Sequence, residues 1–433
     1  MNYNIIILGT GGREASMVSA LRKSKHNLAI TAIGSNYNPT MVHYSVNIVN
    51  LKNRKDIVNY ILESSVDLVI VGPEKYLEEG FVDELQKYGI KCVGPTQKLA
   101  RLETDKYYAR NLLMEIESDT KYYPDFKIFK NYNELELTSF IQSINNSFVV
   151  KNIGLCGGKG VKVMGYDFDT VEEGLQYCKE LIETTGNCLI EEKLEGLEFT
   201  LMSYTDGSVF RHMPVAHDYK RLLNDNDGPQ TGGMGCVINN KKCRISNEKT
   251  KEAQLVNELV IKKLQEDNGE KYKGIVYGSF ILLNKGDNIE ERIKVIEYNC
   301  RFGDPEVIAV LSLLETDFME ICLGIVNNKL KDVEVNHSNE SVCLVYVAPQ
   351  GYPTLKSSDE SGYITVQKID DNMIFANATV TDEKNNIKLL TSRSVAVTGK
   401  GDNLSIARNR TMELVKTISG PIYYRTDIGI NLD

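Results

Sequence analysis

The sequence predicts an α/β protein. Its N-terminal domain is expected to be a doubly wound parallel sheet, followed by a central α/β part with a mobile lid and a C-terminal α+β domain. Short apolar runs alternate with amphipathic helical segments over residues 1–103. A glycine-rich loop joins two strand-like runs at 154–160, and short strands with polar turns dominate from Ser341 onward. A chain of 433 residues is also too long for one hydrophobic core, which favours several domains.

Composition excludes several classes of protein. Hydrophobic residues make up 42% and charged residues 25% of the chain, which is ordinary for a globular protein. The net charge is −9 and no basic block is present, so a dedicated nucleic-acid binder is disfavoured. No apolar run of about eighteen residues and no signal peptide are found, so neither a membrane span nor secretion is expected.

Cysteine and histidine usage narrows the chemistry further. Nine cysteines are scattered without a C-x-x-C pair, which indicates reduced thiols of a cytoplasmic protein rather than disulfides or a zinc site. Only five histidines occur, so histidine-based catalysis is not expected. The expected partners are therefore small molecules, with no nucleic acid and no membrane, for a monomer or small homo-oligomer.

The first domain is expected to bind at the carboxyl ends of its strands. The apolar runs Asn4–Leu8, Asn27–Ile33 and Val66–Val71 are typical of parallel strands buried on both faces. In such doubly wound sheets the ligand lies beyond the carboxyl ends of the strands. The turn Gly9-Thr-Gly-Gly12 follows the first of these runs and precedes a helical segment.

This glycine turn is not a dinucleotide fingerprint. Glu14 occupies the place of the third glycine, and the second strand ends in Gly34-Ser-Asn36 without an acid for the ribose of NAD. A helix N-terminus still attracts anions, so a phosphate-bearing substrate fits better than NAD. The alternative is a tight turn that merely needs glycine.

A flap is expected in the middle of the chain. Phe148–Lys151 and 161–164 read as strands, and the loop between them is rich in glycine. Such a loop can close over phosphates with its backbone N–H groups. It is not a Walker loop, because Gly160 stands where a hydroxyl residue should follow the lysine.

The segment 213–235 has almost no periodicity and is rich in glycine and aspartate. A loop of this length inside a compact domain is usually functional or disordered. Asp218, Lys220 and Arg221 supply charge, and the glycines of 231–235 let the backbone approach a small ligand closely. A disordered surface loop is the alternative.

The strand-like run 293–296 ends in Glu297, Asn299 and Arg301. Side chains two apart on a strand point to one face, so Glu297 and Asn299 are expected side by side. Two oxygen ligands with an arginine beyond them suit a hard divalent cation that holds a phosphate. The alternative is a strand end that fades into a polar turn.

Taken together, these motifs resemble one family. In chain order they are Gly9-x-Gly-Gly-Arg-Glu14, Val71-Gly-Pro-Glu74, Gly157-Gly-Lys-Gly-Val161, Glu191-Glu192, Asp218-x-Lys-Arg221, Gly228-Pro-x-Thr-Gly-Gly-Met-Gly235, Asn299-Cys-Arg-Phe-Gly-Asp-Pro-Glu306, Gly351-Tyr-Pro353 and Asp427-Ile-Gly429. The chain resembles the phosphoribosylamine–glycine ligases, also called glycinamide ribonucleotide synthetases, of the ATP-grasp superfamily, over essentially its whole length. The resemblance implies central ATP-grasp domains and the reaction of ATP, glycine and 5-phosphoribosylamine to glycinamide ribonucleotide, ADP and phosphate in de novo purine synthesis.

The resemblance also implies domains and residue roles. The domains are expected at 1–103, at 104–122 with 188–328, at 123–187 for the lid and at 329–433. ATP is expected to contact Lys106, Lys151, Gly157, Gly158, Lys159, Glu191, Glu192, Lys193, Leu194 and Glu198. The substrates are expected to contact Gly11, Gly12, Arg13, Glu14, Asn36, Glu74, Asp218, Lys220, Thr231, Gly232, Gly233, Arg301 and Asp304. Glu297 and Asn299 are expected to bind Mg²⁺ or Mn²⁺, and Arg301, Lys151 and Asp218 are expected to be catalytic.

Five positions depart from the family pattern. The family usually has histidine at Ala15 and at Tyr219, proline-glycine before Asn36, alanine at Lys75 and asparagine at Gln230. Most of these positions are expected where the amine binds, whereas the ATP and metal motifs are nearly intact. A paralogous ligase for another amine or amino acid therefore stays open as the alternative function, and a nucleotide-binding protein without catalysis is disfavoured because Arg301 is present.

Overall fold

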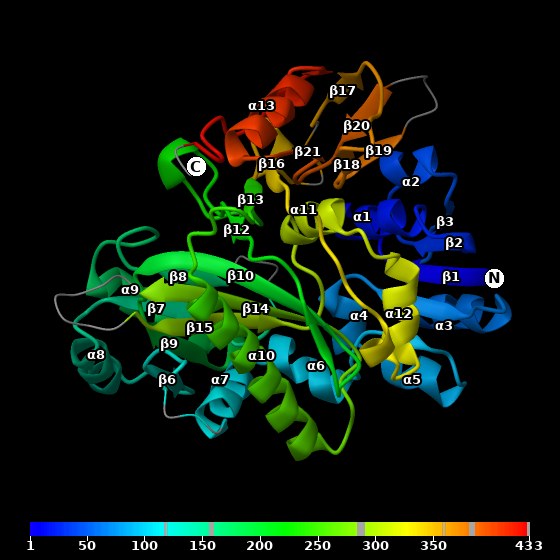
Figure 1. Ribbon diagram of the computed structural model, residues 1–433. Helices are drawn as coiled ribbons and strands as arrows, with labels where there is room; N and C mark the ends of the chain where they lie inside the picture. The colour runs from blue at the N-terminus through cyan, green and yellow to red at the C-terminus, as the bar shows by residue number, and fades with distance from the viewer. Residues whose placement is uncertain are drawn as a thin grey trace.

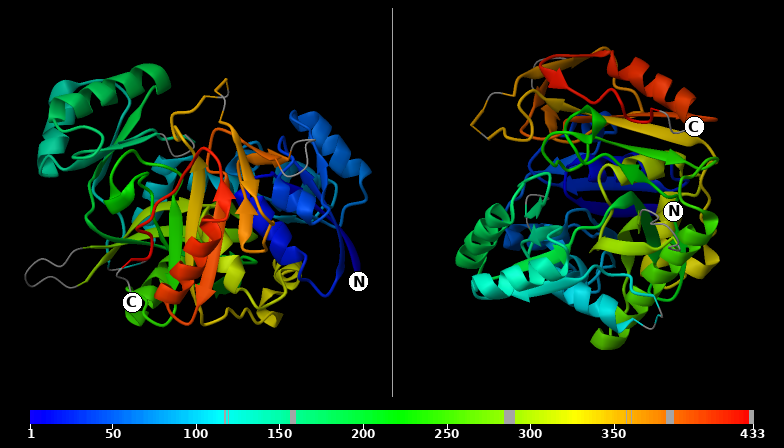
Figure 2. Two further views of the ribbon diagram at one scale, coloured as in Figure 1. Left: turned by 90° about the horizontal axis from the view of Figure 1, so that it is seen from above. Right: turned by 90° about the vertical axis from the view of Figure 1, so that its left-hand side faces the viewer.

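The computed structural model describes residues 1–116, 118, 120–155, 160–283, 291–356, 358–359, 361–380 and 386–430. Within these residues the strands form five sheets. Figure 1 shows the N-terminal sheet at the right, the long strands of the central domain in the middle and the C-terminal domain above them. Seen from above in Figure 2, the lid helices lie at the end of the molecule opposite the N-terminal domain.

The N-terminal domain is a five-stranded parallel sheet in the order β3-β2-β1-β4-β5. Its strands are β1 (Asn2–Leu8), β2 (Asn27–Ile33), β3 (Asn47–Val49), β4 (Leu68–Val71) and β5 (Cys92–Val93). Its helices are α1 (Gly12–Leu21), α2 (Pro39–His43), α3 (Arg54–Glu63), α4 (Glu74–Glu78) and α5 (Phe81–Lys87). The strand order reverses between β1 and β4, so the loops after these two strands open a crevice for a ligand.

The lid is a four-stranded antiparallel sheet in the order β6-β9-β7-β8, with two helices packed against it. It follows the helices α6 (Gln97–Thr104) and α7 (Lys106–Glu115). Its elements are β6 (Phe126–Phe129), α8 (Glu134–Ser143), β7 (Phe148–Lys151), β8 (Val161–Val163), α9 (Val171–Thr185) and β9 (Cys188–Glu192). Apolar side chains of both helices and three of the strands form a separate core, so the lid is a body with its own packing.

The central domain is built on two long strands, β10 (Gly196–Thr205) and β14 (Gly274–Leu283), which pair along their whole length. With β11 (Phe210–His212) and β15 (Ile293–Asn299) they form an antiparallel sheet in the order β11-β10-β14-β15. The helix α10 (Asn247–Asn268) packs its apolar face on this sheet. The helices α11 (Glu306–Leu313) and α12 (Phe318–Val326) then lead toward the C-terminal domain.

The C-terminal domain contains two sheets and one helix. Its remaining elements are β16 (Ser341–Pro349), β17 (Tyr363–Val366), β18 (Met373–Phe375), β19 (Ala378–Val380), β20 (Asn386–Leu389), β21 (Val395–Gly401), α13 (Leu404–Val415), β22 (Ile418–Ser419) and β23 (Ile422–Tyr423). The larger sheet has the order β12-β13-β16-β21-β18 and takes β12 (His217–Asp218) and β13 (Gly235–Asn239) from the central part of the chain. The 219–234 loop therefore leaves and re-enters the C-terminal sheet.

Apolar packing joins the domains. One core cluster contains residues of β1, α1, α11, α12 and β16, so the N-terminal domain packs on the helices that connect to the C-terminal domain. Asn38 donates from Nδ2 to the carbonyl oxygen of Phe375 over 2.8 Å, which ties the loop after β2 to β18. No helix among the described ranges is long and apolar enough to span a membrane.

Two predicted boundaries differ from the structure. The domain prediction ends the lid at residue 187 and so leaves β9 outside it. In the structure β9 lies between β6 and β7 and pairs with both, so it belongs to the lid sheet. The largely apolar run 374–380 predicts one strand, but in the structure it is divided between β18 and β19, which belong to different sheets. Strand β10 was not predicted.

Candidate active site

Glu297 and Asn299 stand near the end of β15, two residues apart on a regular strand, so their side chains share one face. No described residue donates a hydrogen bond to the Glu297 carboxylate or pairs with it. Burial opposes its ionisation, but the positive charges of Lys220, Lys151 and other cations hold the pKa of Glu297 below its usual value. This site therefore offers an ionised carboxylate and an amide oxygen, which is a donor set that Mg²⁺ accepts.

Arg301 lies directly beside these two groups. Its Nη2 donates to Asn299 Oδ1 over 2.9 Å and lies 2.9 Å from Glu103 Oε1. Its Nε donates to Glu74 Oε2 over 3.2 Å. Its Nη1 donates to the main-chain oxygen of Phe302 over 3.1 Å, and this is its one acceptor among the described residues. One N–H of Nη1 is thus left for a ligand, while the rest of the fork is fixed.

Two lysines, one at the start of α7 and one at the end of the lid strand β7, lie near the β15 site. Lys106 at the start of α7 donates from Nζ to the Gly154 carbonyl oxygen over 2.9 Å. Lys151 at the end of β7 is buried and lies 2.5 Å from Glu191 Oε2. Both lysines contribute to the low pKa of Glu297, which places their charges around the β15 site. The predicted lid residues Gly157, Gly158 and Lys159 lie outside the described residues.

The Glu191 carboxylate is held by two cations. Arg110 of α7 donates to Oε1 from Nε over 2.6 Å and to Oε2 from Nη2 over 2.9 Å. The side chain is 3% exposed and also pairs with Lys151. Although burial opposes ionisation, these two cations hold the pKa of Glu191 at about 2. Glu191 therefore fixes the position of the Lys151 side chain, and its contact with the nucleotide stays a prediction.

The hinge from the lid sheet into β10 contains the other predicted nucleotide residues. Glu192 accepts from Lys294 Nζ of β15 over 2.9 Å and from the main-chain amide of Asp125, just before β6, over 3.1 Å. The Lys193 amide donates to the Ser147 carbonyl oxygen over 3.0 Å, and Leu194 is half-buried. The exposed Glu198 is at the start of β10, where its carboxylate accepts from Lys220 Nζ over 3.2 Å. Of these acids, only Glu198 is turned toward the 218–221 segment.

Asp218 and Lys220 form a half-buried pair of opposite charges at the end of β12. Lys220 Nζ lies between two carboxylates, 3.9 Å from Asp218 Oδ2 and 3.2 Å from Glu198 Oε2. Burial raises the pKa of Asp218 to about 7, and the charges of Glu306 and Glu198 add to the rise while Lys220 opposes it. Because Asp218 can gain or lose its charge near neutral pH, it suits the binding of a substrate ammonium group.

The 231–233 turn lies beside this pair. Thr231 donates from its amide and from Oγ1 to the Lys220 carbonyl oxygen, each over 2.8 Å. Its Oγ1 accepts from the Gly233 amide over 3.0 Å. The turn is therefore ordered by hydrogen bonds across the 219–234 loop, and the alternative of a disordered surface loop is wrong for the described residues.

Arg13 and Glu74 link the N-terminal loop to Arg301. Arg13 Nη1 donates to the Gly72 carbonyl oxygen over 2.8 Å and lies 3.7 Å from Glu74 Oε2. The same Glu74 oxygen accepts from Arg301 Nε. Burial opposes the ionisation of Glu74, but Arg301 and Arg13 hold its pKa below the usual value. A continuous polar path thus runs from the N-terminus of α1 to β15.

The Glu14 side chain is buried against the glycine turn before α1 rather than exposed in an open site. Its Oε2 accepts from the Gly11 amide over 2.7 Å, and the side chain is buried, which raises its pKa. A Cβ added at Gly72 would lie 2.2 Å from Glu14 Oε1, so only glycine fits there. The predicted substrate contact of Glu14 is corrected to a capping role, because its carboxylate completes the first turn of α1. Asn36 is half-buried above the loop and donates from its amide to Thr10 Oγ1 over 3.3 Å.

Comparison with known proteins identifies the family. Models of phosphoribosylglycinamide synthetase match in chain order: the N domain at residues 3–103, the ATP-grasp (A) domain at 104–307 and the C domain at 342–431. The chain belongs to the phosphoribosylglycinamide synthetase family. A phosphoribosylamine–glycine ligase of Methanocaldococcus jannaschii is 38% identical, covering 98% of this chain and 96% of that protein. The corresponding ligase of Thermococcus gammatolerans is 35% identical over 98% of this chain and 94% of its own length.

Solved structures support the same architecture. The crystal structure of the phosphoribosylamine–glycine ligase of Thermotoga maritima aligns with a TM-score of 0.80 at 24% identity, covering 98% of this chain and 99% of that one. An ADP complex of N5-carboxyaminoimidazole ribonucleotide synthetase aligns with a TM-score of 0.63 at 14% identity, over 95% of this chain and 96% of that one. The fold of the synthetase family is therefore shared along the whole chain.

Several residues that shape this synthetase site have no signal in the sequence. Glu103 at the end of α6 is buried, accepts from the Cys300 amide over 2.7 Å and pairs with Arg301. Arg110, Tyr346 and Arg393 are likewise single residues in ordinary helix, strand or turn patterns. Only the three-dimensional contact reveals them.

The departures from the family pattern lie mostly away from the site. Ala15 is fully buried in a core cluster of α1, and the Tyr219 ring packs in the C-terminal core with its hydroxyl accepting from the Gly429 amide. Lys75 is exposed and pairs with Glu79 on α4. Ser35 and Gln230 are the two that border the predicted substrate loops. That these positions set the choice of amine stays a prediction.

Proposed function

We propose that this synthetase-family chain joins glycine to 5-phosphoribosylamine and cleaves ATP to ADP and phosphate in the process. In the first step the glycine carboxylate attacks the γ-phosphorus of ATP, which gives glycyl phosphate and ADP. In the second step the amine nitrogen attacks the carbonyl carbon and loses a proton, and phosphate leaves. The product is glycinamide ribonucleotide. No enzyme nucleophile takes part, so catalysis consists of positioning and charge neutralisation.

One observation carries this proposal: the polar path Arg13–Glu74–Arg301–Asn299. It joins an anion-attracting helix N-terminus to a divalent-cation donor set through a single bridging carboxylate. A ligase of this kind needs a phosphate-bearing amine on one side and an acyl phosphate on the other. The path connects Arg13, where the phosphate of the amine is expected, with Arg301, where the acyl phosphate is expected.

The chain's own residues divide the work. Lys106 and Lys151 hold negative charge on the transferred phosphate, and the free N–H of Arg301 neutralises the acyl phosphate. The Asp218 carboxylate accepts the glycine ammonium group, and the charge of Lys220, whose Nζ lies 3.9 Å from Asp218 Oδ2, favours the ionised form of that carboxylate. Arg13 and the first turn of α1 bind the phosphate of the amine.

Mg²⁺ fits the pair Glu297 and Asn299, because the Glu297 carboxylate is ionised and has no protein donor among the described residues. When bound, such an ion neutralises charge on the ATP phosphates and keeps water or phosphate oxygens as its other ligands. We also place the enzyme in the cytoplasm, in keeping with its eight described thiols, all free of disulfides.

Release of ADP tests the function. The purified chain is supplied with Mg²⁺-ATP and glycine, with and without phosphoribosylamine generated in situ, and with a panel of other amines and amino acids. ADP release that depends on both glycine and phosphoribosylamine supports the proposal. Release only with another amine or amino acid identifies the paralogous ligase, and no release with any pair contradicts a catalytic role.

A further inference from the structure

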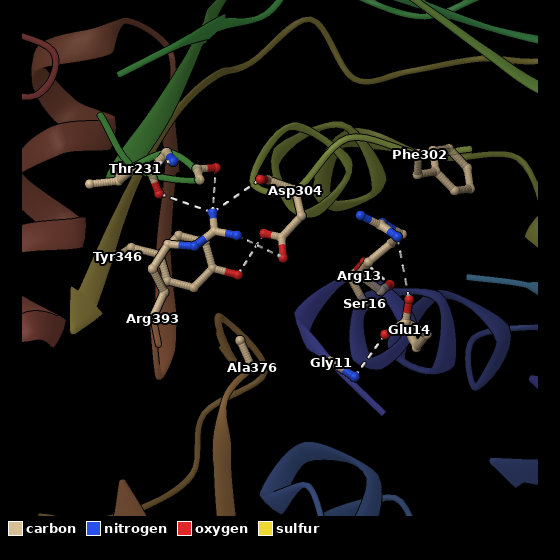
Figure 3. A network of polar contacts seen from close by, with 12 residues as sticks. Gly11, Arg13, Glu14, Ser16, Thr231, Phe302, Asp304, Tyr346, Ala376 and Arg393 are labelled. Carbon is tan, nitrogen blue, oxygen red and sulfur yellow. Dashed lines mark hydrogen bonds and ion pairs between the residues drawn. The ribbon is translucent and has the colours of Figure 1, made fainter. Parts of the chain in front are cut away.

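Arg393 precedes β21 in the C-terminal domain, and its guanidinium group reaches back to the 231–233 turn. Its Nη1 donates to the carbonyl oxygens of Gly232 over 2.7 Å and Gly233 over 3.0 Å. The same nitrogen donates to the main-chain oxygen of Asp304 over 3.0 Å. Figure 3 shows one side chain holding two separate backbone segments together.

The Asp304 side chain is held by the same domain. Its Oδ2 lies 3.4 Å from Arg393 Nη2, and its Oδ1 accepts from the Tyr346 hydroxyl over 2.7 Å. The guanidinium carbon of Arg393 lies 4.5 Å from the centre of the Tyr346 ring. A planar guanidinium fork that stacks on a ring and pairs with a carboxylate has one orientation, which a lysine cannot reproduce.

This cluster of Arg393, Tyr346 and Asp304 lies between the two expected substrate loops. On one side, a Cβ added at Gly232 would lie 2.9 Å from Arg393 Nη2. On the other side, a Cβ added at Gly12 would lie 2.6 Å from the Tyr346 hydroxyl oxygen. Neither position has room for a side chain in this arrangement, so the cluster packs directly against the turn expected to hold the substrate glycine and against Gly12, the first residue of α1.

We propose that Arg393 is a positioning residue for the ligation: it holds the 231–233 turn and Asp304 in register across the place where the amino acid and the amine meet. Arg393 acts through these groups rather than by touching a substrate: its Nη1 donates to three main-chain oxygens, and its Nη2 lies 3.4 Å from Asp304 Oδ2. The C-terminal domain thereby supplies a part of the active site. This inference rests on the proposed function.

Arg393→Ala and Arg393→Lys test this role, with Arg408→Ala as the matched control. Arg408 lies in the same domain and also donates to two main-chain oxygens, those of Ile428 over 3.2 Å and Thr426 over 2.6 Å, but it has no contact with the 231–233 turn. Steady-state kinetics are measured with each substrate varied in turn. Hydrogen exchange of the 231–235 amides is measured in parallel, because it reports the order of the turn independently of activity.

Arg393→Ala is expected to lower kcat/KM for glycine about 10- to 100-fold, since a small misplacement of a bound reactant has an effect of this size. The KM for ATP is expected to stay within about twofold, because the lysines and the β15 site are not displaced. Exchange at 231–235 should accelerate in both Arg393 variants and not in Arg408→Ala. Millimolar guanidinium should restore part of the activity of Arg393→Ala.

Unchanged glycine kinetics, or unchanged exchange at 231–235, would overturn the positioning role. A parallel loss for glycine and ATP, matched by Arg408→Ala and not restored by guanidinium, would mean that Arg393 only stabilises the fold. If the wild-type chain releases no ADP with glycine and phosphoribosylamine, that result alone contradicts the proposed function. The exchange comparison then still decides whether Arg393 orders the turn.

Discussion

Replacing Glu191 by glutamine removes one negative charge from a buried cluster of two cations. Glutamine keeps the size of the side chain but leaves Arg110 and Lys151 without a carboxylate. Loss of one partner from a buried ion pair typically costs about 3–5 kcal/mol, because the remaining charge is uncompensated. The pKa of Glu191 points to a similar size: the fall from 4.5 to about 2 corresponds to about 3 kcal/mol.

The loss depends on pH in a defined direction. The folded-state pKa of Glu191 is depressed, so its contribution to stability is fully present above pH 4.5 and is lost as the pH falls toward 2. The local free energy of opening, read from hydrogen exchange of β7 and β9 amides, should therefore drop by about 3 kcal/mol in Glu191→Gln at pH 7. The difference from wild type should shrink below pH 4.5.

Glu192→Gln is the matched control, since Glu192 is the next residue, is 33% exposed and pairs with Lys294. An exposed pair of this kind contributes at most about 1 kcal/mol. If Glu191→Gln were as stable as Glu192→Gln and raised only the KM for ATP, Glu191 would contact the nucleotide, and the reasoning from its ion pairs would be refuted.

Three further outcomes follow from the site. Glu297→Gln should lower kcat at least about 100-fold while the melting temperature stays within a few degrees, because a metal donor is lost without a packing change; retained turnover would place the metal elsewhere. The KM for glycine should fall as the pH rises from 6 to 8, because Asp218, with its pKa raised to about 7, binds an ammonium group only when it is ionised. The same raised pKa means that the folded protein loses stability as the pH rises from about 4 to 7. Asp218→Asn should remove both effects. Tyr166→Ala should raise the KM for ATP about 3- to 10-fold, because the Tyr166 ring of the lid lies against Lys193 and Arg221 at 4.8 and 4.5 Å. Tyr88→Ala, at an exposed tyrosine remote from the lid, should leave this KM unchanged.

The sequence predicts the fold well where one physical signal dominates. Parallel strands buried on both faces give unbroken apolar runs, and the bounds of β2 and β7 are those expected. Strand β10 was missed because it begins with the exposed Gly196 and Glu198, and because threonine and serine interrupt the apolar residues of its buried part. The division of the lid was misplaced because β9 joins its sheet by pairing with strands distant along the chain, which no local pattern records.

The site is predicted only where motifs are contiguous. Glu297, Asn299 and Arg301 fall within five residues and meet in space as expected. Glu191 has the right residue type and position, yet its role is set by Arg110, a helix residue 81 positions away. Arg393 and Tyr346 act through backbone oxygens and a distant carboxylate, so their contributions depend on packing between domains. Such partners become visible only when the chain is folded.

The pairing of β12 and β13 with β16 has a consequence for how the chain is made. The 219–234 loop is anchored at both ends in a sheet whose next strand, β16, begins at Ser341. During synthesis, more than a hundred further residues must therefore be added after β13 before β16 can pair with it and support the loop. A chain cut before Ser341 would leave β13 with an open edge of unpaired N–H and C=O groups. We therefore expect the central domain to work only together with the C-terminal domain, whose strand β16 supports this loop.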